Sequence, residues 1–62
     1  MKILEKRFER TLTGYNFTVL CKYFGTRWLF KQQTTGELLH FYSPDEYLEV
    51  IIKGIPQSIK SL

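Results

Sequence analysis

Hydrophobic and polar residues alternate over residues 15–24, and no other stretch of the chain is as regular. Period-two alternation over this length is typical of a β-strand with one buried face. The pair Gly25-Thr26 follows, and a glycine in the first position of a two-residue loop is typical of a type II′ turn, which requires a positive φ there. We therefore predict a β-hairpin with strands at about 15–24 and 27–33.

The predicted loop decides which residues of the hairpin share a face, and it places Tyr23 opposite Trp28. One face is then apolar and is expected to form the core: Tyr15, Phe17, Val19, Cys21, Tyr23, Trp28 and Phe30. The opposite face mixes apolar and cationic side chains: Leu20, Lys22, Phe24, Arg27, Leu29 and Lys31.

The segment over about 3–12 fits two patterns. As a helix, Leu4, Phe8 and Leu12 form an apolar stripe with a spacing of four residues. As a strand, the same three side chains face the core and Ile3 faces away. We expect an edge strand, because the Thr-Leu-Thr-Gly-Tyr sequence that follows is more typical of a tight hairpin than of a helix end.

A fourth strand is predicted over about 38–42, after a turn that contains Gly36. Its register is open. A two-residue loop leaves Leu38, His40 and Tyr42 on the outer side of the sheet, whereas a three-residue loop with a bulge turns them toward the core, because one residue of slip exchanges the two faces. The first register agrees better with a continuous core.

A helix is predicted over about 44–53. Ser43 is a suitable N-cap, a proline occupies the first helical position, and Glu46 completes a capping box. Gly54 is expected to end the helix. A short C-terminal tail over 55–62, interrupted by a proline, would follow. The apolar stripe of the helix consists of Tyr47, Leu48, Ile51, Ile52 and Ile55.

Together these elements predict one small α+β domain over residues 1–62. It is a four-stranded antiparallel β-meander with one α-helix packed on one face and a short C-terminal tail. A single helix covers about one face of such a sheet, so the other face is expected to be open. If residues 55–62 fold back over it, or residues 1–12 form a helix there, that face is instead a second layer of core.

Composition narrows the functional classes. Nine Lys and Arg against six Asp and Glu give a net charge of +3, which permits an anionic partner. No stretch approaches the ~20 apolar residues of a membrane span, and the first residues do not resemble a signal peptide, so we expect a cytoplasmic protein without a membrane partner. The single Cys21 cannot form an intrachain disulfide and is expected to be a small buried hydrophobe.

Catalytic chemistry has little support in the sequence. The chain has one histidine and one cysteine, and it lacks a glycine-rich loop that leads into a helix. His40 has no carboxylate or thiol partner to orient it, and a structural zinc site needs four ligands. We therefore expect a non-enzymatic protein with no catalytic residue, no metal, no cofactor and no small-molecule substrate.

The open sheet face is the candidate binding site. Its predicted partner-binding residues are Leu20, Lys22, Phe24, Arg27, Leu29, Lys31, His40 and Tyr42, and Arg7, Thr18 and Gln33 extend it. A contiguous basic and aromatic cluster of this kind usually marks a partner site. A protein partner, including a second copy in a homodimer, is the first expectation, as for a small regulator or inhibitor.

Nucleic acid is the alternative partner, because cations neutralise phosphates and a three-stranded sheet can enter a major groove. The order of Gly25-Thr26-Arg27-Trp28, Thr35-Gly36, a strand and Ser43-Pro44-Asp45-Glu46 is similar to the element order of the arm-binding domains of tyrosine recombinases and of the AP2-type fold. This resemblance covers about half of the chain. It implies a nucleic-acid partner.

Overall fold

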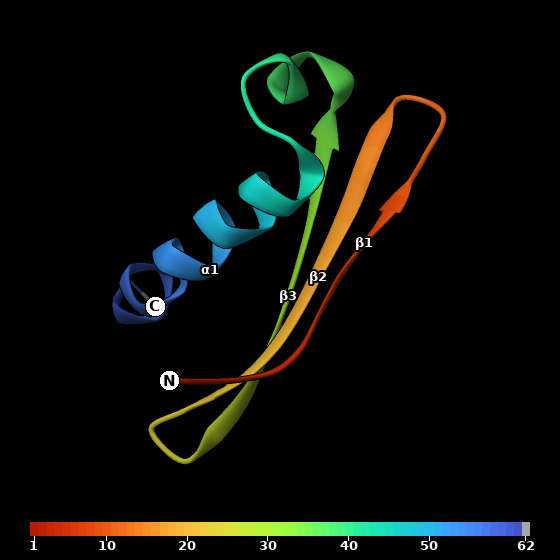
Figure 1. Cartoon of the computed structure of the whole chain (residues 1–62). Coiled ribbons are helices and arrows are strands. Elements are labelled where there is room, and N and C mark those ends of the chain that lie inside the picture. The colour runs from red at the N-terminus through yellow and green to blue at the C-terminus, as the bar shows by residue number, and fades with distance from the viewer. Residues whose placement is uncertain (62) are drawn as a thin grey trace.

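Three antiparallel strands and one long helix make up the fold (Figure 1). The computed structural model describes residues 1–61, apart from the side chains of residues 38 and 39. The strands β1 (Lys2–Arg10), β2 (Gly14–Tyr23) and β3 (Thr26–Thr35) form one sheet in the order β1-β2-β3. A short 3₁₀ helix, η1 (Gly36–His40), and the helix α1 (Pro44–Lys60) follow. The predicted α+β class is confirmed.

The predicted fourth strand is wrong, as is the turn that should precede it. β3 does not end near Gln33 but continues to Thr35, because β2 begins at Gly14 and the pairing extends to its first residue. The chain then enters η1, and the N–H of Gly36 donates to the carbonyl of Thr13 at 3.0 Å. The described residues between Gly36 and Tyr42 therefore contain no strand.

The loop of the central hairpin is Phe24-Gly25, one residue earlier than predicted. Both residues have positive φ, 53° and 73°, as a type I′ turn requires. Tyr23 consequently pairs with Thr26, and Trp28 pairs with Cys21. Because the whole loop lies one residue earlier, each β2 residue pairs with a β3 residue two positions earlier than predicted. A shift of two positions does not exchange the faces of a strand, so every side chain of the two strands keeps its predicted face.

β1 is a strand with a bulge near its start. Ile3 pairs with Cys21 whereas Glu5 pairs with Leu20, so the register shifts between Ile3 and Glu5. An extra residue in one strand reverses the facing of the residues before it. Ile3 therefore packs against the core while Leu4 is exposed, the reverse of the prediction. The prediction for Leu12 is also wrong, because this residue lies fully exposed in the turn after β1.

α1 continues past the predicted stop at Gly54 and past the proline at position 56, so no separate tail over 55–62 begins there. The start is as expected, since the Ser43 side chain accepts from the N–H of Glu46 at 3.3 Å. Ile55 is only 1 % exposed, and Ile59 packs against the same core. Burying these side chains offsets the backbone hydrogen bond that the proline cannot make.

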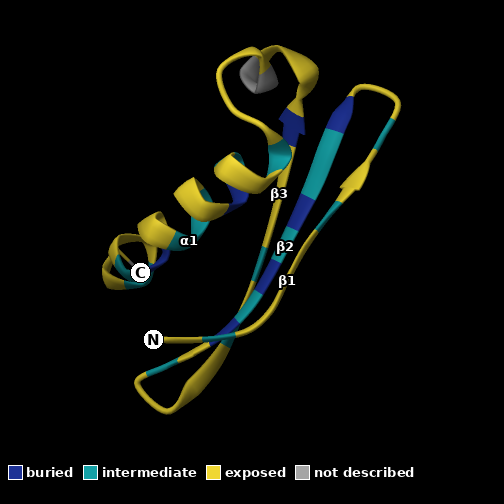
Figure 2. Cartoon of the chain, viewed as in Figure 1, coloured by how far each residue is buried: buried dark blue, intermediate teal, exposed yellow. Residues whose placement is uncertain are grey.

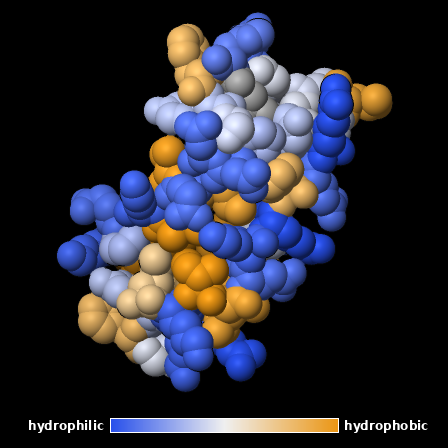
Figure 3. Space-filling view, in the orientation of Figure 1, coloured by the Kyte–Doolittle hydropathy of each residue, from blue (hydrophilic) through white to orange (hydrophobic). Residues whose placement is uncertain are grey.

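The core lies between α1 and the inner face of the sheet, which is the face turned toward α1. Burial is concentrated on β2 and on the sheet-facing side of α1 (Figure 2). The fully buried apolar side chains are Phe17, Val19, Cys21, Leu48 and Ile55. Figure 3 shows hydrophobic residues gathered along the seam between α1 and the sheet. Neither helix of the described chain is long and apolar enough to cross a membrane.

Candidate functional site

The side of the sheet turned away from α1, called the outer face below, is built from rows of paired residues. Each row takes one side chain from each strand, because directly paired residues of antiparallel strands point to the same side. The rows are Lys2–Lys22–Arg27, Glu5–Leu20–Leu29, Arg7–Thr18–Lys31 and Glu9–Asn16–Gln33.

The charges of the outer face are unevenly paired. On β1, the guanidinium of Arg7 lies 3.6 Å from a carboxylate oxygen of Glu5 and 3.8 Å from one of Glu9. On β2 and β3, no lysine or arginine of the outer face lies within ion-pair distance of a carboxylate in the described chain. Positive charge is therefore concentrated on the β2–β3 half of the outer face.

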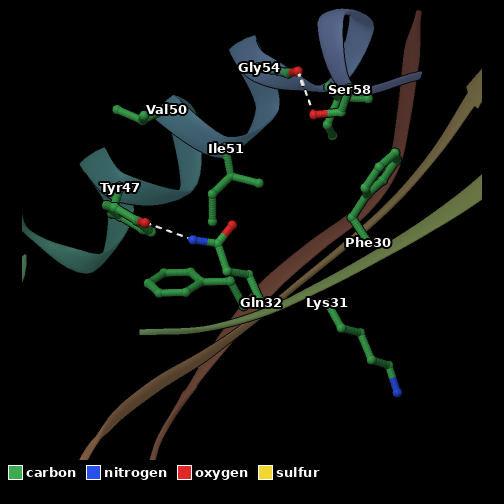
Figure 4. Close-up of a pocket in the computed structure, with 10 residues that line it drawn as sticks. Phe30, Lys31, Gln32, Tyr47, Val50, Ile51, Gly54 and Ser58 are labelled. Carbon is green, nitrogen blue, oxygen red and sulfur yellow. Dashed lines mark hydrogen bonds between the residues drawn. The ribbon is translucent and has the colours of Figure 1, made fainter. Parts of the chain in front are cut away.

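A shallow polar hollow of about 400 Å³ lies on the outer face. Its polar lining includes Arg7 and Lys31 as cations, Asn16 and Gln33 as amides, and Thr18 as a hydroxyl, together with the carboxylate of Glu9, which lies 3.8 Å from Arg7. Figure 4 shows the Lys31 side chain pointing away from α1, toward this side of the sheet. The hollow offers cations beside amides, which are groups that can contact phosphates and base edges.

Five of the predicted site residues share the outer face: Leu20, Lys22, Arg27, Leu29 and Lys31. Phe24 is separate from them at the tip of the hairpin, where it is 80 % exposed. His40 lies in η1, and the ring of Tyr42 packs edge-on against Tyr47 of α1 with centroids 6.0 Å apart. The structure therefore does not bring His40 and Tyr42 to the outer face, because they do not belong to a fourth strand. The side chain of residue 38, also expected on this face, lies outside the described structure.

Lys2 and Asn16 belong to the outer face but were not among the predicted site residues. Asn16 follows from the alternation of β2 and could have been included. Lys2 could not, because its position depends on the bulge at Leu4, for which the sequence carries no signal such as a glycine.

The inner face carries no evident reactive group among the described residues. Cys21 is fully buried, and this burial raises the pKa of its thiol above the ordinary value. A thiol of this kind is inert in the folded state. Within the part of the chain that the structure describes, His, Cys, Asp and Glu side chains nowhere gather in threes that could hold a metal ion.

A second groove, of about 270 Å³, lies between α1 and β3 (Figure 4). Phe30 and Gln32 line it from the strand, and Tyr47, Val50 and Gly54 line it from the helix. One hydrogen bond crosses it, from the amide nitrogen of Gln32 to the hydroxyl of Tyr47 at 2.7 Å.

Comparison with known proteins leaves the outer face as the guide to function. The chain matches no protein-family model, no curated protein and no solved structure. The features available for assigning a function are therefore the sheet face turned away from α1, its polar hollow, and the cations of β2 and β3 that form no ion pair within residues 1–61.

Proposed function

We propose that the chain is a small DNA-binding module that lays the outer face of its sheet on a double helix. The observation that carries this proposal is the set of cations Lys22, Arg27 and Lys31, which lie on the sheet face turned away from α1 and form no ion pair with any described residue. Each cation that meets a phosphate releases condensed counterions, which supplies most of the affinity for a polyanion.

The position of the aromatic rings favours a duplex over a single strand. Proteins that bind single strands stack the bases on exposed rings of the binding surface. In this chain the rings of β2 and β3 are all at inner-face positions, and Phe24 lies outside both strands, in the hairpin loop. The outer face therefore has no ring on which a base could stack among the described strand residues.

The dimensions of the sheet suit a major groove. Strands of a sheet lie about 4.8 Å apart, so three strands span about 10 Å between their outer axes. The major groove of B-DNA is about 12 Å wide and admits a two-stranded ribbon, so β2 and β3, which carry Lys22, Arg27 and Lys31, can enter it. The major groove of duplex RNA is too narrow and deep for such a ribbon. The longest dimension of the molecule is 35 Å, which corresponds to about 10 base pairs at ~3.4 Å each.

The test is fluorescence anisotropy with a labelled mixed-sequence DNA duplex of about 20 base pairs, compared with either of its single strands and with the matching RNA duplex. We expect the DNA duplex to bind tightest, with an affinity that falls steeply as salt rises. The double variant Arg27→Ala/Lys31→Ala should weaken duplex binding and reduce the logarithmic salt slope by about 2, because two phosphates are no longer neutralised.

The matched control is Lys53→Ala/Lys60→Ala, which removes the same charge from exposed positions on α1. It should leave the salt slope nearly unchanged. An equal loss of affinity in this control would mean that net charge alone drives binding. Absence of salt-sensitive binding to any of the nucleic acids would overturn the proposal, and stronger binding to a single strand would overturn its duplex part.

A protein partner is the second candidate, and the exposed apolar residues Phe24 and Leu29 favour it. Its support is weaker than the sequence implied, since His40 and Tyr42 lie elsewhere and Leu20 is half-buried. On this hypothesis Phe24→Asp abolishes association with the partner while the chain stays folded, and Arg27→Ala/Lys31→Ala has a smaller effect.

A further inference from the structure

The two edges of the sheet differ in how well they are protected against pairing with another strand. β1 has a bulge and six charged residues among its nine: Lys2, Glu5, Lys6, Arg7, Glu9 and Arg10. Bulges and edge charges are devices that prevent edge-to-edge association. β3 pairs with β2 without a bulge along all ten of its residues, and only Arg27 and Lys31 are charged. The β3 edge is therefore less protected than the β1 edge.

The backbone groups of β3 that face outward can be assigned from the hairpin. A two-residue loop is closed by a hydrogen-bonded pair, here Tyr23 and Thr26, and hydrogen-bonded and non-hydrogen-bonded pairs then alternate. The N–H and C=O groups of Arg27, Leu29 and Lys31 therefore point away from β2, toward the free edge. An incoming strand would find these donors and acceptors in line.

The groove between α1 and β3 runs beside this edge. On the helix side of the groove, Val50 is 45 % exposed. A Cβ placed on Gly54, on the same side, would have no atom within 4 Å. On the strand side of the groove, Phe30 is only half-buried. This inner side of β3 consequently has apolar surface available beside the free backbone groups.

We infer that β3 pairs antiparallel with β3 of a second copy of this chain, with Phe30 opposite Phe30 at the two-fold axis. This register pairs nearly the whole strand and sets Lys31 opposite Leu29. Two neighbouring registers are less favourable. A two-fold axis at Lys31 would place the two Lys31 side chains opposite each other, and an axis at Leu29 would place Arg27 of one copy opposite Lys31 of the other. Like charges placed directly opposite one another destabilise a strand pair, so the Phe30 register is favoured over both neighbours.

The pairing would join two three-stranded sheets into one, with both outer faces on the same side. The inference rests on the β3 edge and does not depend on the proposed DNA binding. Because Lys31 of each copy would lie diagonally across the axis, about 7–8 Å apart, the pairing should strengthen as salt screens this repulsion. DNA binding should weaken under the same change, so the two properties are separable.

Substitutions at Leu29 test both the pairing and its register, by sedimentation equilibrium of the whole chain over a range of concentrations. Leu29 is 59 % exposed, so polar substitutions there should leave the monomer folded, which circular dichroism checks. Leu29→Lys puts a cation opposite Lys31 in each of the two symmetric pairs and should raise the dimer Kd about tenfold. Leu29→Glu puts an anion there, and should lower the Kd by a similar factor and reverse its salt dependence.

Leu29→Gln is the control, since it removes the apolar side chain without adding charge and should fall between the other two variants. Equal weakening by all three would instead indicate dimerisation through apolar contacts on the outer face, and would overturn the β3 pairing. A mass that stays monomeric at every concentration and salt would overturn it as well. Neither result bears on DNA binding, which the anisotropy measurement tests on its own.

Discussion

The two faces of the sheet are made by the same strands and differ in what covers them. On β2 the inner residues Phe17, Val19 and Cys21 are fully buried beneath α1, whereas the outer residues Thr18 and Leu20 between them are only half-buried. The inner face therefore supplies most of the stability of this small domain. The outer face is left free to carry charge, and that freedom is what makes it a candidate site.

The largest expected effect is on the free energy of unfolding, when one large side chain on each face of the sheet is truncated to alanine. Phe17→Ala should cost about 3–5 kcal/mol, because Phe17 is buried and its ring contacts Tyr47 with centroids 5.1 Å apart. This is a large share of the stability of so small a domain. Leu29→Ala on the outer face should change the free energy of unfolding by less than about 0.5 kcal/mol. Urea titration followed by circular dichroism measures both, and equal losses of stability would contradict the division between the faces.

A substitution at Gly14 tests how much the close backbone contact at one end of the sheet contributes to stability, compared with the packed inner face. A Cβ at Gly14 would lie 1.8 Å from the carbonyl oxygen of Thr34, a backbone atom that cannot move without parting β2 from β3. We expect Gly14→Ala to cost about 1–3 kcal/mol, as overpacking does elsewhere. Gly54→Ala is the matched control, since its Cβ would meet no atom within 4 Å. It should be neutral or stabilising in the same urea titration, because alanine favours helix.

The buried thiol reports on how often the inner face opens. Because burial raises the pKa of Cys21 and excludes reagent, a disulfide reagent at neutral pH should modify native protein far more slowly than unfolded protein. The absorbance of the thiolate that the reagent releases gives both rates. Replacing Leu29 by alanine should not change the native rate, whereas Ile55→Val, which loosens the core over β2, should raise it. A native rate equal to the unfolded rate would show that α1 does not protect this face.

The smallest effect concerns the ion pair that joins the edge of the sheet to α1. The ammonium of Lys6 donates to a carboxylate oxygen of Glu49 at 2.8 Å, and this hydrogen bond lowers the pKa of Glu49. A lowered pKa in the folded state stabilises the fold above the ordinary pKa of a glutamate, and this stabilisation is lost as pH falls through the lowered value. Glu49→Gln should therefore melt slightly lower than the parent near neutral pH, and the gap should close as the pH falls below the ordinary pKa of a glutamate. Both side chains are exposed, so the gap is small, and a gap that widens in acid would contradict this assignment.

Local patterns in the sequence were sufficient for several elements. The alternation of β2 predicted its core face, because a strand places successive side chains on opposite sides whatever surrounds it. The start of α1 was also predictable, because Ser43 and Glu46 satisfy helix-end groups within a few residues of one another. Five outer-face members of the site followed from the same alternation, once the hairpin was recognised.

The lengths of α1 and β3 were harder to predict, for a different reason in each case. The apolar spacing that continues through Ile55 and Ile59 was present in the sequence, but Gly54 and the following proline are stronger local signals for a helix end. The helix continues because the sheet offers these isoleucines a surface to pack against. β3 continues to Thr35 because β2 is there to pair with it, so its length is a property of two strands and not of one.

The sequence by itself therefore determined the features that depend on neighbours along the chain: the alternation of β2, a hairpin near Gly25 and the helix start at Ser43. Only the tertiary structure decided the bulge near Leu4, the position of the loop, the extent of the longer elements and the placement of His40 and Tyr42 away from the outer face. Each of these depends on free energy gained from residues far away in the chain. A short window of sequence does not contain that contribution, which is why the open face could be predicted while its full membership could not.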